Sequence, residues 1–395
     1  MKFLRILLLS LICIACKDNA KEFSQKNGTQ KDQGEFFVEF NALDSTYCNK
    51  QKKEIAFRYN QLINKNDFYG QFLVAKNGKI LFEDYQGFAY KEKEDKNRKN
   101  KPLHIASVSK VLTAAVILRM VDQGKIGLDD KVSKFLKGFY YDDITVRMLL
   151  NHRSGLRHYG YFIERDVKWD KSKRITNQDI LELINSGKIH LESKPGTRFA
   201  YCNTNYSILA LIIEKVSGMR YHEAMDKLLF KPLGMKNSFV FDYEKQHDTV
   251  SQTYKSSKLR LAFDHLDLVY GDKNIYSTAR DLLKFDLATY SDKFFSKKLR
   301  KEIFKGYSYE SKGEKNYGLG IRLREWKAAP TLTYHNGWWH GNTSSYITQK
   351  TDTITIIALS NKMTHKTYQT KKFIAIFNSK YPIKLDNSEV GGANE

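Results

Sequence analysis

The chain has 395 residues, of which 41% are hydrophobic and 13% aromatic, so it is long and apolar enough to bury a full core. Its five prolines and the lack of a repeated segment exclude collagen-like chains and solenoids. The 66 Lys and Arg residues against 44 Asp and Glu give a formal charge of +22. Lysines are scattered among acids, and no nucleic-acid-binding motif accompanies them. We therefore expect a solvated basic surface and no nucleic-acid partner.

The N-terminus has the features of an export signal. An apolar run from Ile6 to Ala15 follows basic residues and is too short to span a bilayer as a mature helix. Its end, Ala15-Cys16, resembles the lipobox of bacterial lipoproteins, which implies that residues 1–15 are removed and that Cys16 carries lipid. Cys13 departs from that pattern, so ordinary signal cleavage is the alternative. The predicted location is the cell envelope, on a membrane facing the periplasm or the cell surface.

Composition divides the remainder into three parts. Residues 16–51 are polar and predict a flexible tether, residues 52–385 predict one globular domain, and residues 386–395 predict a polar tail. The two cysteines outside the signal region, Cys48 and Cys202, fall in different parts, and both are expected to be free thiols.

Helical and strand patterns alternate along the predicted domain. Apolar spacing from Lys52 predicts a first helix, and Asn77-Gly78 between two alternating segments predicts a β-hairpin over residues 71–85. Helical spacing then dominates, and strands return near the C-terminus. The expected helices are Ser107–Asp122, Val146–Asn151, Asn177–Asn185, Asn205–Val216, Ala279–Thr289 and Lys371–Asn378, and the expected late strands are Tyr317–Leu323, Ser344–Gln349 and Thr353–Leu359.

This order predicts an α/β fold. One antiparallel sheet would be assembled from both ends of the chain, with flanking helices and a mostly helical lobe inserted between its two parts. The functional site is expected where the sheet meets the lobe.

Three short motifs carry the chemistry: an S-x-x-K from Ser107 to Lys110, a Y-x-N from Tyr201 to Asn203, and an H-x-G from His335, in which Gly337 predicts a turn. A serine hydroxyl is a weak nucleophile and needs a base within hydrogen-bond reach. The serine and lysine of the first motif lie one helical turn apart and share a face, so the amine can reach the hydroxyl. The start of a helix also places backbone N–H groups beside a developing oxyanion.

With these motifs in this order, the chain resembles the serine β-lactamase and penicillin-binding-protein superfamily, in the branch of class C β-lactamases, D-alanyl-D-alanine carboxypeptidases and related esterases. The resemblance covers residues 68–359. Further stretches that carry it include LLNHRSGL at Leu149–Leu156 and YGLG at Tyr317–Gly320.

The resemblance implies a role for each motif residue. Ser107 would be the acylated nucleophile, Lys110 and Tyr201 would share the work of the general base, and Asn203 would hydrogen-bond the substrate amide. His335 would act either as a cation or as a neutral hydrogen-bond donor, and both forms remain open.

The resemblance also implies an oxyanion hole made by the backbone N–H groups of Ser107 and of Trp338, the residue after Gly337. No metal and no organic cofactor would be needed. The substrate would be a small molecule or a peptide derived from peptidoglycan.

Three functions fit these residues: hydrolysis of D-Ala-D-Ala-type amides or peptides, hydrolysis of small acyl esters, and non-catalytic binding of a cell-wall or signalling ligand. Trp338-Trp339 stand where relatives often carry small residues, so the choice between peptide, β-lactam and ester stays open. An intact S-x-x-K and the tyrosine of the second motif favour catalysis over binding alone.

Overall fold

The computed structural model describes residues 35–64 and 67–383 of the chain. The predicted signal, Cys16 and the predicted tail over residues 386–395 lie outside the described residues. Within the described ranges, no helix combines the length and the apolar character needed to cross a bilayer.

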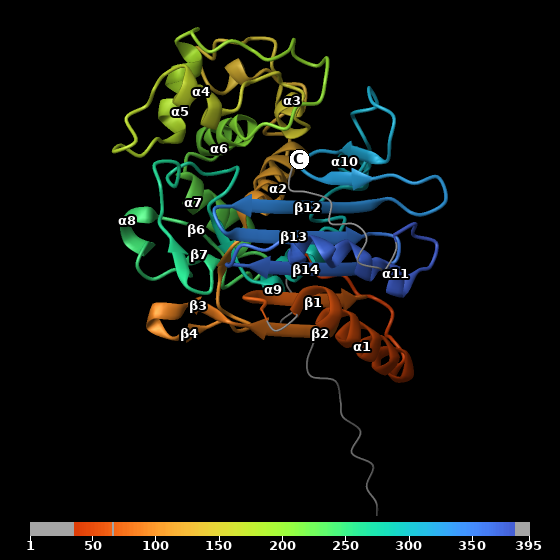
Figure 1. The fold of residues 1–395 in the computed structure, drawn as a ribbon. Helices are drawn as coiled ribbons and strands as arrows, with labels where there is room; N and C mark the ends of the chain where they lie inside the picture. Colours follow the sequence, from red (N-terminus) through yellow and green to blue (C-terminus); the bar gives the residue numbers. More distant parts are fainter. Residues whose placement is uncertain (1–34, 65–66, 384–395) are drawn as a thin grey trace, which may run out of the picture. The chain divides into compact units, whose positions relative to one another are not determined.

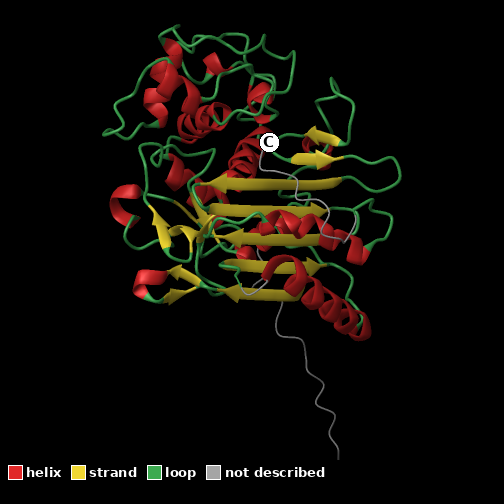
Figure 2. Cartoon of the chain, in the orientation of Figure 1, coloured by secondary structure: helices red, strands yellow, loops and turns green. Residues whose placement is uncertain are grey.

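A seven-stranded antiparallel sheet forms the centre of the fold (Figures 1 and 2). Its order, β10-β11-β12-β13-β14-β1-β2, pairs the N-terminal hairpin with the last strand of the chain. The predicted sheet built from both chain ends is confirmed. The strands are β1 (Gly70–Lys76), β2 (Lys79–Gln86), β10 (Lys315–Tyr317), β11 (Arg322–Arg324), β12 (Leu332–Trp339), β13 (Asn342–Gln349) and β14 (Ile354–Ser360).

Both faces of this sheet are buried. Successive residues of a strand point to opposite faces, and in β1 Leu73 joins one apolar core while Phe72 and Val74 join another. Helices α1 (Ser45–Tyr59) and α11 (Ile374–Phe377) and the 3-10 helix η7 (Lys366–Phe373) cover the Phe72 face (Figure 1). Helices α2 (Ser109–Asp122) and α9 (Ala279–Ala288) pack on the Leu73 face. Double coverage explains why every residue of β14 is buried.

A mostly helical lobe is inserted between the two parts of the sheet, as the sequence predicts (Figure 2). Its helix α5 begins at a capping box in which Thr176 and Asp179 bond each other's backbone N–H. Besides α2 and α9, the α-helices between β2 and β10 are α3 (Val146–Leu150), α4 (Tyr159–Arg165), α5 (Asn177–Asn185), α6 (Thr204–Ser217), α7 (Tyr221–Met225), α8 (Tyr243–Gln246) and α10 (Lys297–Ile303).

Short strands build three small sheets outside the central sheet. They are β3 (Phe88–Tyr90) with β4 (Asp95–Lys96), the order β5 (Leu103–His104), β9 (Ile275–Ser277), β6 (Phe239–Val240), and β7 (Thr253–Ser256) with β8 (Leu259–Leu261). The three-stranded sheet matters most for the site, because β5 leads directly into the segment that carries Ser107.

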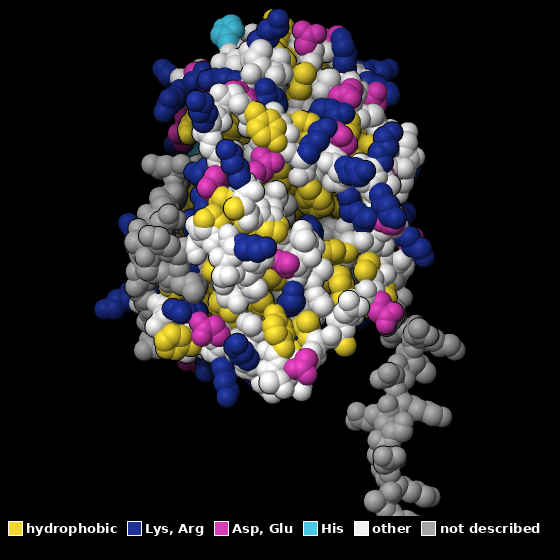
Figure 3. All heavy atoms as spheres, turned by 90° about the vertical axis from the view of Figure 1, so that its right-hand side faces the viewer, with side chains coloured by type: hydrophobic (Ala, Val, Ile, Leu, Met, Phe, Trp, Pro, Cys, Tyr) yellow, Lys and Arg dark blue, Asp and Glu magenta, His cyan; other side chains and the backbone are white. Residues whose placement is uncertain are grey.

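Basic side chains are spread over the face of the molecule shown in Figure 3, with acidic and apolar side chains among them. On this face the positive charge is therefore not gathered into a single stripe.

The domain starts earlier than residue 52, so the predicted tether over residues 16–51 is too long. Helix α1 begins at Ser45, and the Asp44 side chain caps it by accepting from the Tyr47 N–H. Phe36 is buried, with its ring centroid 5.3 Å from that of Phe294. Because the segment is polar on average, its composition did not predict that a single apolar residue such as Phe36 packs into the core.

Two later elements also differ from the prediction. The expected strand Tyr317–Leu323 is divided into β10 and β11, because the chain between them turns through Gly320 at a left-handed φ of +85°. The helix expected over Lys371–Asn378 begins earlier, as the 3-10 helix η7, and becomes α-helical only at Ile374. Both predicted thiols, Cys48 and Cys202, are free.

Replacing Phe36 with alanine tests the corrected domain start. We expect Phe36→Ala to lower the free energy of unfolding by about 3 kcal/mol, because it empties an aromatic site that also contacts Arg119. The neighbouring Phe37 is 52% exposed, so Phe37→Ala should change stability by about 0.5 kcal/mol or less. Denaturant unfolding of both variants measures the difference, and equal stabilities would show that the segment is a tether after all.

Candidate active site

Ser107 lies in the 3-10 helix η4 (Ala106–Val108), immediately before α2. The Lys110 Nζ lies 3.1 Å from the Ser107 Oγ and 2.9 Å from the backbone oxygen of Asp272. The Lys110 side chain is fully buried, so these contacts fix where its amine points. The base-to-nucleophile contact expected from the S-x-x-K spacing is present.

The turn before Ser107 is strained and firmly held. Ala106 has a left-handed φ of +47°, which costs a residue with a Cβ about 1–2 kcal/mol. Its N–H donates to the His104 Nδ1 at 3.0 Å, and the Ser344 hydroxyl donates to the Ile105 carbonyl oxygen at 2.6 Å. The strain is thus offset by contacts from β5 and β13, and the hydroxyl of Ser107 is presented at the start of α2.

Tyr201 reaches the same place from the segment before α6. Its ring centroid lies 5.2 Å from the Lys110 Nζ and 4.4 Å from the centroid of the His152 ring. His152 holds this segment, since its Nδ1 accepts from the Cys202 N–H at 3.1 Å and its carbonyl oxygen accepts from the Ala200 N–H at 2.9 Å. His152 therefore positions Tyr201.

The charge state of His152 suits that role. Burial, followed by the positive charges of Lys110 and Arg322, lowers the pKa of His152 well below its usual value. The ring is neutral, and its Nδ1 can accept a backbone hydrogen bond.

Asn203 occupies the N-cap position of α6, but its side chain makes no capping hydrogen bond. Its Oδ1 is buried and has no partner among the residues that the structure describes. An unpaired buried polar atom is costly, and a hydrogen-bond donor on a bound substrate would satisfy it.

His335 lies in the middle of β12 and is fully buried. Its Nδ1 lies 2.7 Å from the Asn336 carbonyl oxygen, and its Nε2 lies 3.1 Å from the Tyr317 hydroxyl. Burial, with the positive charges of Arg322 and Lys110, lowers the pKa of His335 well below its usual value. Of the two forms left open by the sequence, the structure favours the neutral one.

Gly337 is not in a turn, so that prediction is wrong. It lies inside β12, and the chain reverses at His340 and Gly341. A Cβ at Gly337 would lie 2.3 Å from the Ser344 Oγ and 2.8 Å from the Ile105 carbonyl oxygen. Glycine is required because β12 passes directly against the turn that precedes Ser107.

Beyond Tyr334, β12 has no further pairing with β11 in the part of the chain that the structure describes. The stretch from His335 to Trp339 thus leaves one backbone edge unpaired beside η4. The N–H of Trp338, the expected oxyanion donor, belongs to this stretch, while the Trp338 side chain is 52% exposed. Its role as a donor stays a prediction.

Arg322 is a site residue that the sequence did not reveal. Its guanidinium carbon lies 4.7 Å from the ring centroid of Tyr201 and 5.9 Å from that of Tyr317. The chain has many basic residues, and nothing in the sequence around Arg322 distinguishes it from the others as a site residue. Only the pairing of β11 with β12, which sets Arg322 opposite Tyr334, places this cation beside the motif residues.

Comparison with known proteins agrees with this geometry. A model of the beta-lactamase family matches residues 69–379. The chain belongs to the beta-lactamase family. This is a family of serine hydrolases, and the observed antiparallel sheet with flanking helices is the architecture of its penicillin-binding members.

Individual beta-lactamase-family relatives span most of the chain. A penicillin-binding protein of Bacillus subtilis is 31% identical over 335 residues, which cover 81% of this chain and 74% of the relative. A teichoic acid D-alanine hydrolase of Staphylococcus aureus is 26% identical over 325 residues, covering 81% and 75%. The crystal structure of a penicillin binding protein from Bacillus halodurans superimposes with a TM-score of 0.69 at 21% identity, covering 84% of this chain and 99% of that one.

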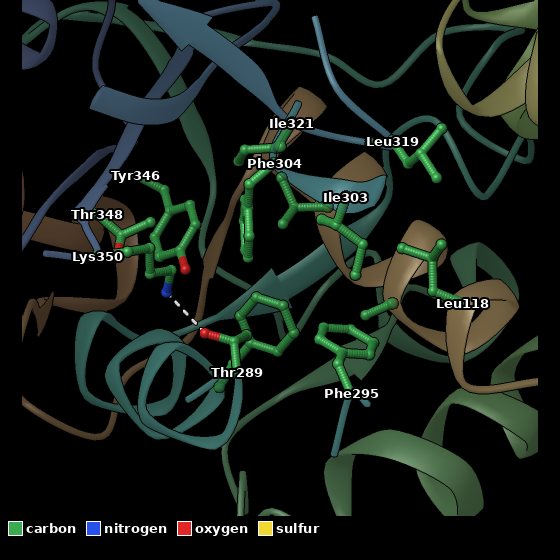
Figure 4. A pocket seen from close by; sticks show the side chains of 14 residues that line it. Leu118, Thr289, Phe295, Ile303, Phe304, Leu319, Ile321, Tyr346, Thr348 and Lys350 are labelled. Carbon is green, nitrogen blue, oxygen red and sulfur yellow. Dashed lines mark hydrogen bonds between the residues drawn. The ribbon is translucent and has the colours of Figure 1, made fainter. Parts of the chain in front are cut away.

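A separate apolar pocket is lined by Val111, Ala115 and Leu118 of α2 and by side chains of other elements (Figure 4). Its free volume is about 30 Å³, which is room for little more than a water molecule. Two of its lining residues are joined to each other, since Lys350 donates to the Thr289 hydroxyl at 2.6 Å. None of the beta-lactamase motif residues lines this pocket, so it belongs to the core and not to the site.

One group of described side chains, Asp264, Asp267 and His340, has ligand atoms within 4.8 Å of one another. The His340 Nε2 lies 3.6 Å from the Asp267 carboxylate and 3.7 Å from that of Asp264. Burial opposes protonation of His340, but the two carboxylates outweigh it and raise the pKa of the imidazole. Sequence spacing did not show this group because the histidine comes from a distant hairpin. Its geometry is that of an ion pair, and the expectation that no metal is needed stays a prediction.

A Cβ at Gly337 has no room beside the Ser344 hydroxyl and the Ile105 carbonyl oxygen, so we expect Gly337→Ala to force β12 away from the turn before Ser107. We expect acylation by a small serine-directed probe to slow by about 10²-fold, the cost typical of a misplaced oxyanion donor. Gly341→Ala is the matched control, since its Cβ would lie 2.4 Å from the Tyr254 carbonyl oxygen, in the same hairpin but against β7. It should lose stability and keep the acylation rate per folded molecule. Stopped-flow acylation after a folding check measures both, and equal rates would contradict the proposed close approach.

Proposed function

We propose that this chain is a serine hydrolase of the cell envelope that forms an acyl-enzyme on Ser107 and cleaves D-alanyl amide or peptide bonds. The observation that carries the proposal is the 3.1 Å contact between the buried Lys110 Nζ and the Ser107 Oγ. A protein that only binds a ligand has no need to bury an amine against a hydroxyl, because burying an ionisable group is costly.

The proposed reaction proceeds in two steps. In the first, the Ser107 Oγ bonds to the substrate carbonyl carbon and its proton passes to Lys110 or Tyr201. Backbone N–H groups at Ser107 and Trp338 bind the oxyanion, and the leaving amine departs with that proton. In the second, water attacks the acyl carbon as one of its protons passes to the same base. The bond between that carbon and the Ser107 Oγ then breaks, the base returns the proton to Oγ, and the carboxylic acid product leaves.

Arg322 favours a substrate with a carboxylate near the scissile bond. Its guanidinium lies beside the Tyr201 ring, and guanidinium groups bind carboxylates with paired hydrogen bonds. The C-terminal carboxylate of a D-Ala-D-Ala peptide meets this requirement. The Bacillus subtilis relative described as a penicillin-binding protein supports the same substrate class.

A D-alanyl ester is the second candidate substrate. It presents the same D-alanyl carbonyl to Ser107, with an alcohol as the leaving group, and the Staphylococcus aureus relative is described as a teichoic acid D-alanine hydrolase. Because an alkoxide leaves more readily than the anion of an unprotonated amide nitrogen, such an ester would depend less on proton transfer to the leaving group.

The test is intact-mass analysis after exposure to a fluorophosphonate, a β-lactam, a D-Ala-D-Ala peptide and a D-alanyl ester. Ser107→Ala should abolish the covalent adducts and lower turnover by about 10⁴-fold or more, because the nucleophile is absent. Ser109→Ala is the control, since Ser109 is the neighbouring serine of α2 and its Oγ is engaged elsewhere, accepting from the Ile275 N–H at 3.2 Å. Adducts that persist in Ser107→Ala would refute the assignment, and turnover of the ester alone would select the second candidate.

We also propose that the mature protein begins at a lipid-modified Cys16, on the strength of Ala15-Cys16 after a short apolar run. Cys16→Ser should move the protein from the membrane fraction to the soluble or unprocessed fraction, while Cys48→Ser should leave it at the membrane. Mass spectrometry of the N-terminal peptide in the producing cell measures the modification. A wild-type N-terminus without lipid, starting at another residue, would overturn the proposal.

A further inference from the structure

Tyr317 is a buried tyrosine of β10 that lies outside the three motifs, only 1% exposed. Its hydroxyl lies 3.1 Å from the His335 Nε2, and its ring centroid lies 6.1 Å from that of His335. The catalytic steps derived above give this hydroxyl no task. It nevertheless contacts the histidine of the third motif.

The direction of this hydrogen bond follows from the other ring nitrogen. The His335 Nδ1 lies 2.7 Å from the Asn336 carbonyl oxygen, which can only accept, so Nδ1 must carry the hydrogen. A neutral imidazole then has its lone pair on Nε2. The Tyr317 hydroxyl must therefore donate to Nε2.

The surroundings favour two neutral partners. Burial raises the pKa of Tyr317 well above its usual value, so the phenol keeps its proton. Burial, Arg322 and Lys110 lower the pKa of His335, so the imidazole stays unprotonated. The titratable and charged groups that face His335 come from every element packed against it: Lys110 from α2, His152 from the segment after α3, Tyr201 from the segment before α6, Tyr317 from β10, Arg322 from β11 and, across the strand pair, Tyr346 from β13.

We propose that Tyr317 is a positioning residue whose hydroxyl locks His335 into the neutral tautomer with hydrogen on Nδ1. Both ring nitrogens of His335 are then engaged, so the imidazole shapes the site without carrying the proton of the reaction. That proton moves between Ser107, Lys110 and Tyr201. The inference rests on the proposed function for its kinetic consequence, whereas the tautomer itself does not depend on turnover.

The first measurement is the tautomer, read from imidazole nitrogen chemical shifts of the ¹⁵N-histidine-labelled full chain. We expect His335 to be neutral with hydrogen on Nδ1 at pH 7, and a wild-type His335 that is charged or carries hydrogen on Nε2 would overturn the proposal. Because this readout needs no substrate, a failure of the proposed hydrolase activity would leave it interpretable.

The second measurement follows the pH titration of the His335 ring nitrogens, together with the acylation rate, in Tyr317→Phe. The lost hydrogen bond stabilises only the unprotonated imidazole, so its removal raises the pKa of His335. The protonation midpoint of His335 should move up by about one pH unit, the size expected for one hydrogen bond, and acylation should slow where the imidazole becomes charged. A His335 midpoint that stays at the wild-type position would overturn the proposal.

Tyr346→Phe is the matched control. Tyr346 lies directly opposite His335 in the β12–β13 register and is equally buried, but its hydroxyl donates to Asp286 at 2.7 Å. This variant also loses one phenol hydrogen bond on the same sheet face, and it should leave the protonation midpoint of His335 in place. An equal shift in both variants would mean that loss of stability, not the hydrogen bond from Tyr317, moves the midpoint.

Discussion

The site depends on the close approach of β12 to the turn before Ser107. Gly337 leaves no room for a Cβ against the Ile105 carbonyl oxygen and Ala106, and Ser344 ties the same turn to the sheet. This contact joins residues that are more than two hundred positions apart in the chain. It brings an unpaired strand edge beside a nucleophile at the start of a helix, which is the arrangement that acyl transfer requires.

Around that contact, the protein surrounds one buried amine with aromatic rings. The Lys110 Nζ lies 5.2 Å from the ring centroid of Tyr201 and 5.7 Å from that of Tyr206. The two histidines that adjoin these rings, His152 and His335, both have a pKa well below the usual value and are neutral. These two histidines therefore contribute fixed hydrogen bonds to the site and no positive charge. Such a preorganised, poorly solvated site strengthens each remaining electrostatic contact.

Short sequence patterns, such as turn dipeptides and helix-capping residues, predicted much of the secondary structure. The Asn77-Gly78 turn fixed the first hairpin, and the Thr176 capping box set the start of α5, because both depend on residues close together in the chain. Local composition did not predict the structure where the burial or backbone conformation of a single residue determined it. The segment around Phe36 is polar on average, so its composition did not predict that the Phe36 ring is buried against Phe294. In the same way, the β-rich composition of Tyr317–Leu323 did not predict the bend at Gly320 between β10 and β11.

The sequence alone determined the fold class, the family and the S-x-x-K pair, since Ser107 and Lys110 meet across one helical turn wherever that helix forms. It could not place Arg322 or Tyr317, nor choose the charge state of His335. The positions of Arg322 and Tyr317 depend on which strands pair, and the charge state of His335 depends on how completely its imidazole is removed from water. Desolvation and long-range contact are properties of the packed structure, and no spacing along the chain encodes them.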